Sequence, residues 1–277
     1  MKFTTLVAVT AVVGASFALG ACTTGEPNPY GNKAGDVWSG YKTATAETHA
    51  MQDDDFENPA MPVVDAALET YNADPGNGAS CASCHGAPDD ATGGKIGVPM
   101  KGVGAKYPIY DPATKAPINV ELRINKCRTE AQGAKAFKYE SDDMQGMTAL
   151  VNMQSRGMPR VTTADEPGDV LNPAFQAGKE FYYQRRGQLD MACKHCHEDN
   201  PATLIRAETL SQGQSNGFPT YRFKWQKMGS LHRRFRGCNK NIRAEPYGYG
   251  SIEYLNLETY LAWRGRGLPV EAPAVRK

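Results

Sequence analysis

The sequence CASCH spans residues 81–85, and a second stretch of the same pattern, CKHCH, spans residues 193–197. Each stretch holds two cysteines separated by two residues, and a histidine directly follows the second cysteine. In an exported protein this pattern is the attachment signature of c-type haem, because the thiols form thioether bonds to the haem vinyl groups and the histidine binds the iron. We therefore predict two covalently bound c-type haems. The attachment cysteines are Cys81, Cys84, Cys193 and Cys196, and the proximal iron ligands are His85 and His197.

A four-cysteine zinc site and a redox-active dithiol are the alternatives for these cysteines. The two pairs of such a zinc site are normally separated by roughly 15 to 20 residues, whereas Cys193 follows Cys84 by 109 positions. A redox dithiol needs one pair and no histidine. The spacing and the histidines therefore favour haem.

The chain contains an internal repeat. Three landmarks recur at offsets of 110 to 112 positions: Cys81 and Cys193, Cys127 and Cys238, and Arg156 and Arg266. The stretch SRGMP at 155–159 corresponds to GRGLP at 265–269, and both resemble helix ends marked by Gly and Pro. We predict a mainly α fold with two tandem cytochrome c-like haem domains, long loops and little sheet.

Two amphipathic segments precede these helix ends. Residues 142–157 place Met147, Leu150 and Val151 on one helical face, and residues 251–265 begin at a capping Ser251 and stack Tyr254, Leu257 and Leu261. We expect both faces to pack over haem. The predicted division is a signal peptide (1–21), a tether and N-terminal extension (22–50), an N-terminal haem domain (51–160), a linker (161–172) and a C-terminal haem domain (173–277).

The first residues have the layout of a bacterial export signal. Lys2 precedes an apolar run from Leu6 to Leu19, and small residues follow it. LGAC, which ends at Cys22, resembles a lipobox, while ordinary cleavage near Ala21 is the alternative. We predict a periplasmic protein and leave open whether Cys22 carries a lipid anchor. No later segment is apolar enough to span a bilayer.

The chain of 277 residues has a formal net charge of +1 and a mean hydropathy of −0.52. Nucleic-acid binding usually requires a clear basic excess, so this charge argues against it. Any anion-binding site must therefore be local.

Two lone cysteines lie at matched distances after the haem motifs. Cys127 follows His85 by 42 positions, and Cys238 follows His197 by 41. We predict that each sulfur is the distal ligand of its haem iron. A disulfide between them is the alternative, since the periplasm is oxidising.

Other residues could also bind iron. Met158 is a candidate in the first repeat, but its counterpart Leu268 cannot bind iron. Met228 and His232 are candidates for the second haem and have no equivalents in the first repeat.

A basic stretch, HRRFRGCNKNIR at 232–243, surrounds Cys238. Guanidinium groups suit oxyanions because their donor fork matches two oxygens at once. Around Cys127 the stretch RINKCRTEAQ also contains the acidic Glu130. We therefore predict that the second haem site meets an anionic substrate and that the first is a relay.

Several longer stretches carry a family resemblance, above all YYQRRGQLDMACKHCHE, LSQGQSNGFPTYR and RFRGC. With them, nearly all of the chain beyond the leader resembles the SoxA family, the dihaem subunits of SoxAX cytochromes. The lipobox-like Cys22 departs from the family pattern.

The resemblance implies an L-cysteine S-thiosulfotransferase, which joins thiosulfate oxidatively to a cysteine of the carrier protein SoxYZ. It also implies a heterodimer with SoxX, a monohaem cytochrome c that removes the electrons. By the same resemblance, His85 and Cys127 are the axial ligands of the first haem, and His197 and Cys238 those of the second. Cys238 is then the catalytic residue, often found as a persulfide, and Arg234 binds the substrate. A non-catalytic dihaem electron carrier and, less favoured, a dihaem peroxidase are the alternative functions.

Overall fold

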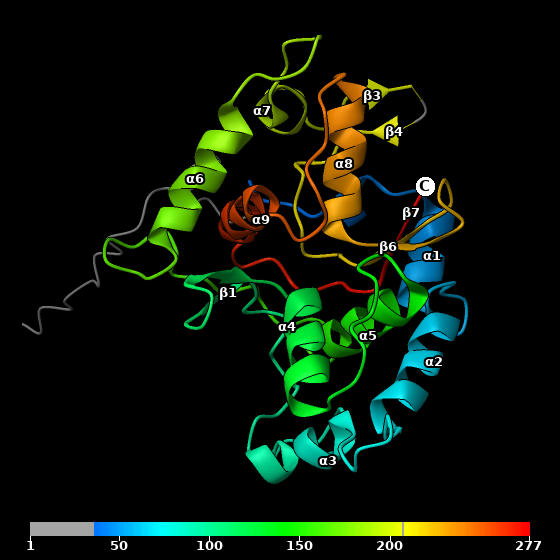
Figure 1. Cartoon of the computed structure of the whole chain (residues 1–277). Helices are drawn as coiled ribbons and strands as arrows, with labels where there is room; N and C mark the ends of the chain where they lie inside the picture. Colours follow the sequence, from blue (N-terminus) through cyan, green and yellow to red (C-terminus); the bar gives the residue numbers. More distant parts are fainter. Residues whose placement is uncertain (1–35, 207) are drawn as a thin grey trace, which may run out of the picture.

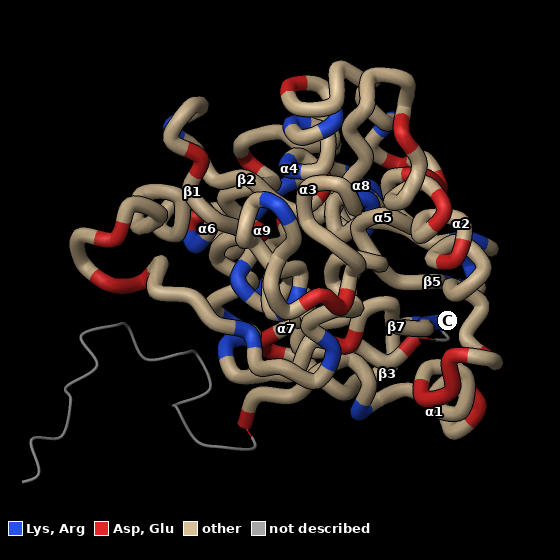
Figure 2. Tube along the Cα trace, turned by 90° about the horizontal axis from the view of Figure 1, so that it is seen from below, with Lys and Arg blue, Asp and Glu red and all other residues tan. Residues whose placement is uncertain are grey.

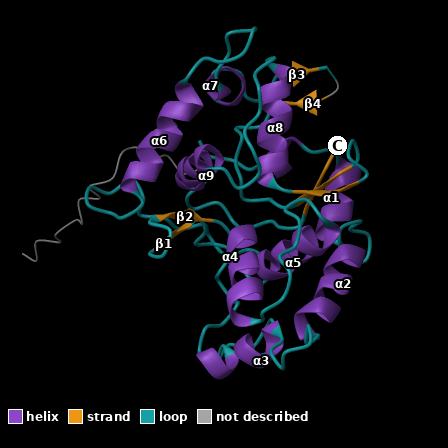
Figure 3. Ribbon diagram, in the orientation of Figure 1, coloured by secondary structure: helices purple, strands orange, loops and turns teal. Residues whose placement is uncertain are grey.

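A computed structural model describes residues 36–206 and 208–277. The predicted signal peptide (1–21), Cys22 and the first part of the predicted tether lie outside the described residues. Helices dominate the described chain, and the strands are short (Figures 1 and 3). Within the described ranges, no helix is long and apolar enough to cross a membrane.

The same series of elements occurs twice along the chain. The first series is α2 (Met61–Asn72), α3 (Cys81–His85), β1 (Ile109–Asp111), β2 (Ala116–Ile118), α4 (Val120–Lys126) and α5 (Asp142–Met153). The second is α6 (Asn172–Tyr183), α7 (Cys193–His197), β5 (Thr220–Arg222), β6 (Lys227–Gly229), α8 (Leu231–Asn241) and α9 (Ile252–Arg264). The remaining elements are η1 (Gly40–Thr43), α1 (Ala46–Asp53), η2 (Gly94–Ile96), the π-helical turn η3 (Cys127–Ala131), β3 (Leu204–Ile205), β4 (Glu208–Thr209) and β7 (Ala274–Arg276).

Each repeat is built on one pair of crossing helices, α2 with α5 and α6 with α9. The predicted apolar faces of α5 and α9 are buried. Both pairs cross at a glycine: a Cβ on Gly146 would meet the backbone oxygen of Val63, and a Cβ on Gly178 that of Asn256. Helix α9 begins after Ser251 as predicted, but the Ser251 hydroxyl caps no backbone amide.

The two repeats exchange their short hairpins. Strands β1 and β2 pair antiparallel, and β2 lies against α9 of the second repeat. Strands β5 and β6 also pair antiparallel, and β6 lies against α5 of the first repeat. Met228 of β6 is fully buried in the core formed by α2 and α5. The second core in turn receives Tyr110 from β1.

The end of the chain also ties the repeats together. Strand β7 pairs parallel with β5 and packs against α1. Pro159 and Pro269, at the ends of the two repeats, form a bridge across the boundary. The two repeats on either side of the predicted linker (161–172) therefore pack against each other. The boundaries of the linker remain a prediction.

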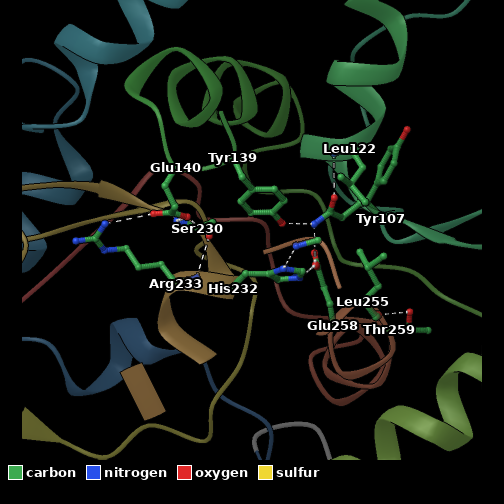
Figure 4. Close-up of polar contacts among 12 residues, drawn as sticks. Tyr107, Leu122, Tyr139, Glu140, Ser230, His232, Arg233, Leu255, Glu258 and Thr259 are labelled. Atoms are coloured by element: carbon green, nitrogen blue, oxygen red, sulfur yellow. Dashed lines mark hydrogen bonds and ion pairs between the residues drawn. The ribbon is translucent and has the colours of Figure 1, made fainter. Parts of the chain in front are cut away.

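A polar cluster joins the repeats between α4, α8 and α9 (Figure 4). Glu258 of α9 accepts a hydrogen bond from Asn119 Nδ2 at 3.1 Å and lies 3.2 Å from His232 Nε2. Tyr139 stacks on the fully buried His232 ring and bonds Asn119 through its hydroxyl. A cavity of about 20 Å³ adjoins this cluster, with Glu121 in its wall. The interface between the two repeats therefore contains hydrogen-bonded polar and ionisable side chains as well as apolar ones.

Candidate functional site

The histidines of both CxxCH segments are oriented by backbone carbonyls. His85 Nδ1 lies 3.0 Å from the Val98 oxygen, and His197 Nδ1 lies 2.8 Å from the Ser211 oxygen. A carbonyl at this distance accepts a hydrogen bond from Nδ1–H, and this fixes the tautomer whose Nε2 can bind a metal ion. Iron-bound histidines use this arrangement. The residues of both segments therefore fit covalently attached haem.

The second repeat brings its predicted ligands together. The imidazole of His197 hydrogen-bonds the sulfur of Cys238, which comes from α8. Cys193 and Cys196 interact electrostatically with the same sulfur. The two predicted attachment thiols, the predicted proximal histidine and the predicted distal sulfur thus form one group.

Cys238 lies in a positively charged environment. Burial raises the pKa of its thiol, but Arg234, the His197 hydrogen bond and Arg222 outweigh burial and lower the pKa to about 7. Arg234 precedes Cys238 by one helical turn on α8, so both side chains share a face. The thiolate is the form of cysteine that attacks electrophiles and binds metals.

Three of the other basic side chains of this stretch serve other contacts. Arg233 Nη1 lies 3.4 Å from Glu140, and Arg236 bonds the Tyr247 carbonyl oxygen. Arg243 donates to Gln188. Figure 2 shows several basic segments beside α7, next to acidic ones. The local positive charge predicted for the second site is therefore present, and Arg234 delivers it from α8.

Arg222 of β5 lies outside the basic stretch around Cys238 and is a further positive side chain at this site. Its side chain is 8% exposed, and it acts electrostatically on Cys238 from the hairpin rather than from α8. Two signals were available: it ends the family stretch LSQGQSNGFPTYR, and it stands 111 positions after Asp111 of the first repeat.

The first repeat has a different charge pattern. Cys127 lies near Cys81 and Cys84, and burial raises the pKa of its thiol despite the opposing charge of Arg123. In the described part of the chain no hydrogen bond joins His85 to Cys127. In the first repeat Cys127 thus lies near the two cysteines of α3, and His85 ends the same helix with its Nδ1 on the Val98 oxygen.

The structure also places the alternative ligands. Met228 is fully buried in the first core, and Met158 is 36% exposed beside Gly102. His232 uses Nε2 with Glu258 and accepts the Gly250 amide at Nδ1 at 3.0 Å (Figure 4). His195 accepts the Ala192 amide at the start of α7. Met228 and His232 are thus committed to the packing of the interface.

The cysteine alternatives are not formed either. Cys127 and Cys238 are both free thiols. Segments α3 and α7 lie at opposite ends of the molecule (Figure 1), so their cysteine pairs do not combine into a zinc site. Among the described residues, no group of three or more His, Cys, Asp and Glu side chains is arranged to hold a metal ion.

Comparison with known proteins identifies relatives across both repeats. A family model described as SoxA/TsdA, cytochrome c domain, matches residues 66–160 and 177–270. The L-cysteine S-thiosulfotransferase subunit SoxA of Pseudaminobacter salicylatoxidans is 45% identical over 250 residues, which cover 90% of this chain and 84% of the relative. The subunit of the same name from Rhodovulum sulfidophilum is 43% identical and covers 87% of this chain and 80% of its own.

A solved structure shares the fold. The crystal structure of SoxXA from P. pantotrophus matches with a TM-score of 0.79 and 42% identity, over 87% of each chain. The two matched segments of the family model confirm the predicted mainly α fold with repeated cytochrome c domains.

Proposed function

This chain belongs to the SoxA family of cytochrome c proteins, and we propose that it is the subunit of an L-cysteine S-thiosulfotransferase that joins thiosulfate to a cysteine of a carrier protein. The observation that carries the proposal is the group formed by His197, Cys238 and Arg234 at the second CxxCH segment. It combines a haem-attachment site, an activated sulfur and a guanidinium in one place. An electron carrier would need the first of these alone.

A cytochrome c domain binds haem covalently, and we propose one haem on each segment. In each case the cysteines attach it and the histidine, oriented by a backbone carbonyl, binds the iron. Bound haem would accept electrons one at a time. Cys127 and Cys238 are the proposed distal ligands.

The chain's own residues support the sulfur chemistry. Cys238, as thiolate or persulfide, forms a sulfur–sulfur bond to the outer sulfur of thiosulfate with the loss of two electrons, while Arg234 holds the sulfonate. The carrier thiolate then attacks that outer sulfur, takes it over together with its sulfonate and displaces the Cys238 sulfur as an anion. In the net reaction one carrier thiolate and one thiosulfate form a sulfur–sulfur bond and release two electrons. Both reactants are anions, so the positive charge of Arg234 lowers the free-energy cost of their approach.

Partners and compartment complete the proposal. The SoxXA relative supports a SoxX partner that receives the electrons. We propose SoxYZ as the carrier, thiosulfate as substrate and the periplasm as the site of action. Lipidation at Cys22 would add a membrane anchor.

Replacement of the sulfur at the second site tests the function. Cys238→Ala should abolish thiosulfate-dependent turnover, at least about a thousandfold, because the proposed acceptor atom is gone. Haem content, measured by pyridine haemochrome and mass spectrometry, should stay at wild-type level because the attachment cysteines remain. Cys127→Ala is the matched control at the first site and should keep measurable turnover. Full activity of Cys238→Ala would leave the electron-carrier function instead.

A further inference from the structure

A carboxylate spans the two guanidinium groups beside Cys238. Glu208 of β4 places Oε1 2.8 Å from Arg222 Nη2 and Oε2 3.7 Å from Arg234 Nη2. The exposed Lys224 places its Nζ 3.9 Å from Glu208 Oε1. Glu208 therefore occupies the place where the two arginines converge.

The three side chains come from three separate elements. Arg234 is on α8 and Arg222 on β5, while Glu208 belongs to the short β3–β4 hairpin beside the end of α8 (Figure 1). Arg222 is held in place, because its Nε donates to the Lys277 carbonyl oxygen at 2.9 Å and its guanidinium lies over Trp225. The arginine is thus fixed before any anion arrives.

The first repeat provides an internal comparison for Arg222. Its equivalent in β1 is Asp111, which is buried and paired with Lys126 at 2.8 Å. Arg234 has the equivalent Arg123, so the α-helical arginine occurs in both repeats and the hairpin arginine occurs in the second repeat only. The hairpin therefore brings a positive side chain to Cys238, whereas the equivalent side chain of the first repeat is an aspartate paired with Lys126.

We propose that Arg222 and Arg234 together form the oxyanion-binding pair of the second site, and that Glu208 occupies this pair until the substrate anion displaces it. This inference rests on the proposed function and adds a second binding residue and a gating residue to it. Two guanidinium groups match the oxygens of a tetrahedral sulfur oxyanion. While no substrate is bound, the Glu208 carboxylate reduces the electrostatic repulsion between the two guanidinium groups.

Displacement of Glu208 is energetically accessible. Its side chain is 29% exposed and that of Arg234 is 30% exposed. An ion pair this open to solvent is weak, and the shorter contact of Glu208, 2.8 Å, is with the more buried Arg222. A dianion that reaches both arginines can therefore replace the single carboxylate. The hairpin strands contain two residues each, so Glu208 can move without disturbing a larger sheet.

Glu208→Gln is the direct test. Removal of the competing charge should lower the KM for thiosulfate about three- to tenfold and leave kcat within about twofold. Sulfate, an unreactive tetrahedral dianion, should become a stronger competitive inhibitor by a similar factor. Both constants are measured on the haem-loaded complex with its carrier protein.

Arg222 variants test the other half of the proposal. Arg222→Gln should raise the KM and the sulfate inhibition constant about tenfold or more, whereas Arg222→Lys should recover part of the loss because it keeps the charge. If Arg222→Gln fails to incorporate haem, Arg222→Lys and Glu208→Gln decide the question.

Asp190→Asn is the matched control. Asp190 forms a 2.9 Å ion pair with Arg185 in the same repeat, and its positive φ suits asparagine. It should change neither constant. An unchanged or weaker sulfate affinity in Glu208→Gln, or an equal effect in Asp190→Asn, would overturn the proposal. Absence of thiosulfate-dependent turnover in the wild-type complex would instead refute the proposed function, and the sulfate measurements would still report on the arginine pair.

Discussion

Cys127 and Cys238 occupy matched positions in the duplicated chain, but their surroundings shift their pKa values in opposite directions. Burial dominates at Cys127, whereas Arg234, His197 and Arg222 outweigh burial at Cys238. The sequence predicted Cys238 and Arg234 because both lie within RFRGC. Arg222 and Glu208 lie 16 and 30 positions before Cys238, so only the folded hairpins reveal their proximity.

Glu121 provides a pH test at the interface. Burial, together with the Glu258 and Glu140 carboxylates, raises the pKa of Glu121 to about 8. The folded protein then retains a proton that the unfolded chain releases above about pH 4.3. The free energy of unfolding should therefore fall as pH rises from about 4.5 to 8 and level off above that range.

Glu121→Gln should remove this pH dependence and stabilise the protein at pH 7.5, by about 1 kcal/mol or more. Denaturant unfolding at pH 5.5 and 7.5 measures both effects. The exposed Glu69→Gln serves as control and should keep the wild-type pH slope. An unchanged slope in Glu121→Gln would show that the side chain is ionised in the folded protein.

At the scale of elements, helices were the most predictable part. The faces through Met147 and Leu150, and through Tyr254 and Leu257, are buried as the 3.6-residue periodicity indicated. The hairpins were less visible because their strands contain three residues each, too few for an alternating pattern to show. The Ser251 hydroxyl was expected to cap α9 and does not, because cap geometry depends on the local rotamer as well as on residue type.

Gly178 tests the close crossing of α6 and α9. Gly178→Ala should lower the free energy of unfolding by about 1–3 kcal/mol, because the new methyl group overlaps the Asn256 carbonyl and forces the helices apart. Thermal or denaturant unfolding of the haem-loaded protein measures the change. The exposed Gln176→Ala on the same helix should stay within about 0.5 kcal/mol. Equal stability of Gly178→Ala and wild type would refute the packing argument.

At the scale of the whole molecule, the sequence predicted two repeats but not their exchange of hairpins. Repeat offsets show which segments correspond, whereas they do not show which repeat a hairpin packs against. The contacts of Met228 with the first core, and of Tyr110 with the second, depend on the relative placement of the repeats. Folding of either half is therefore coupled to the other.

Met228 tests this coupling. Met228→Ala should destabilise the protein by about 2–4 kcal/mol, and hydrogen exchange should accelerate in α2 and α5 although the substitution lies in the second repeat. Met158→Ala, at an exposed position, is the matched control and should leave exchange unchanged. Faster exchange confined to α6 and α9 would contradict the exchange of hairpins.

The reciprocal hairpins have a consequence for ancestry. A two-fold exchange of the same element between equal partners is the arrangement of an isologous dimer. A single-repeat ancestor with this hairpin would have left its core open to solvent until a second copy closed it. Gene fusion of such a dimer would give one polypeptide whose halves could diverge independently, as the equivalent residues Asp111 and Arg222 have done.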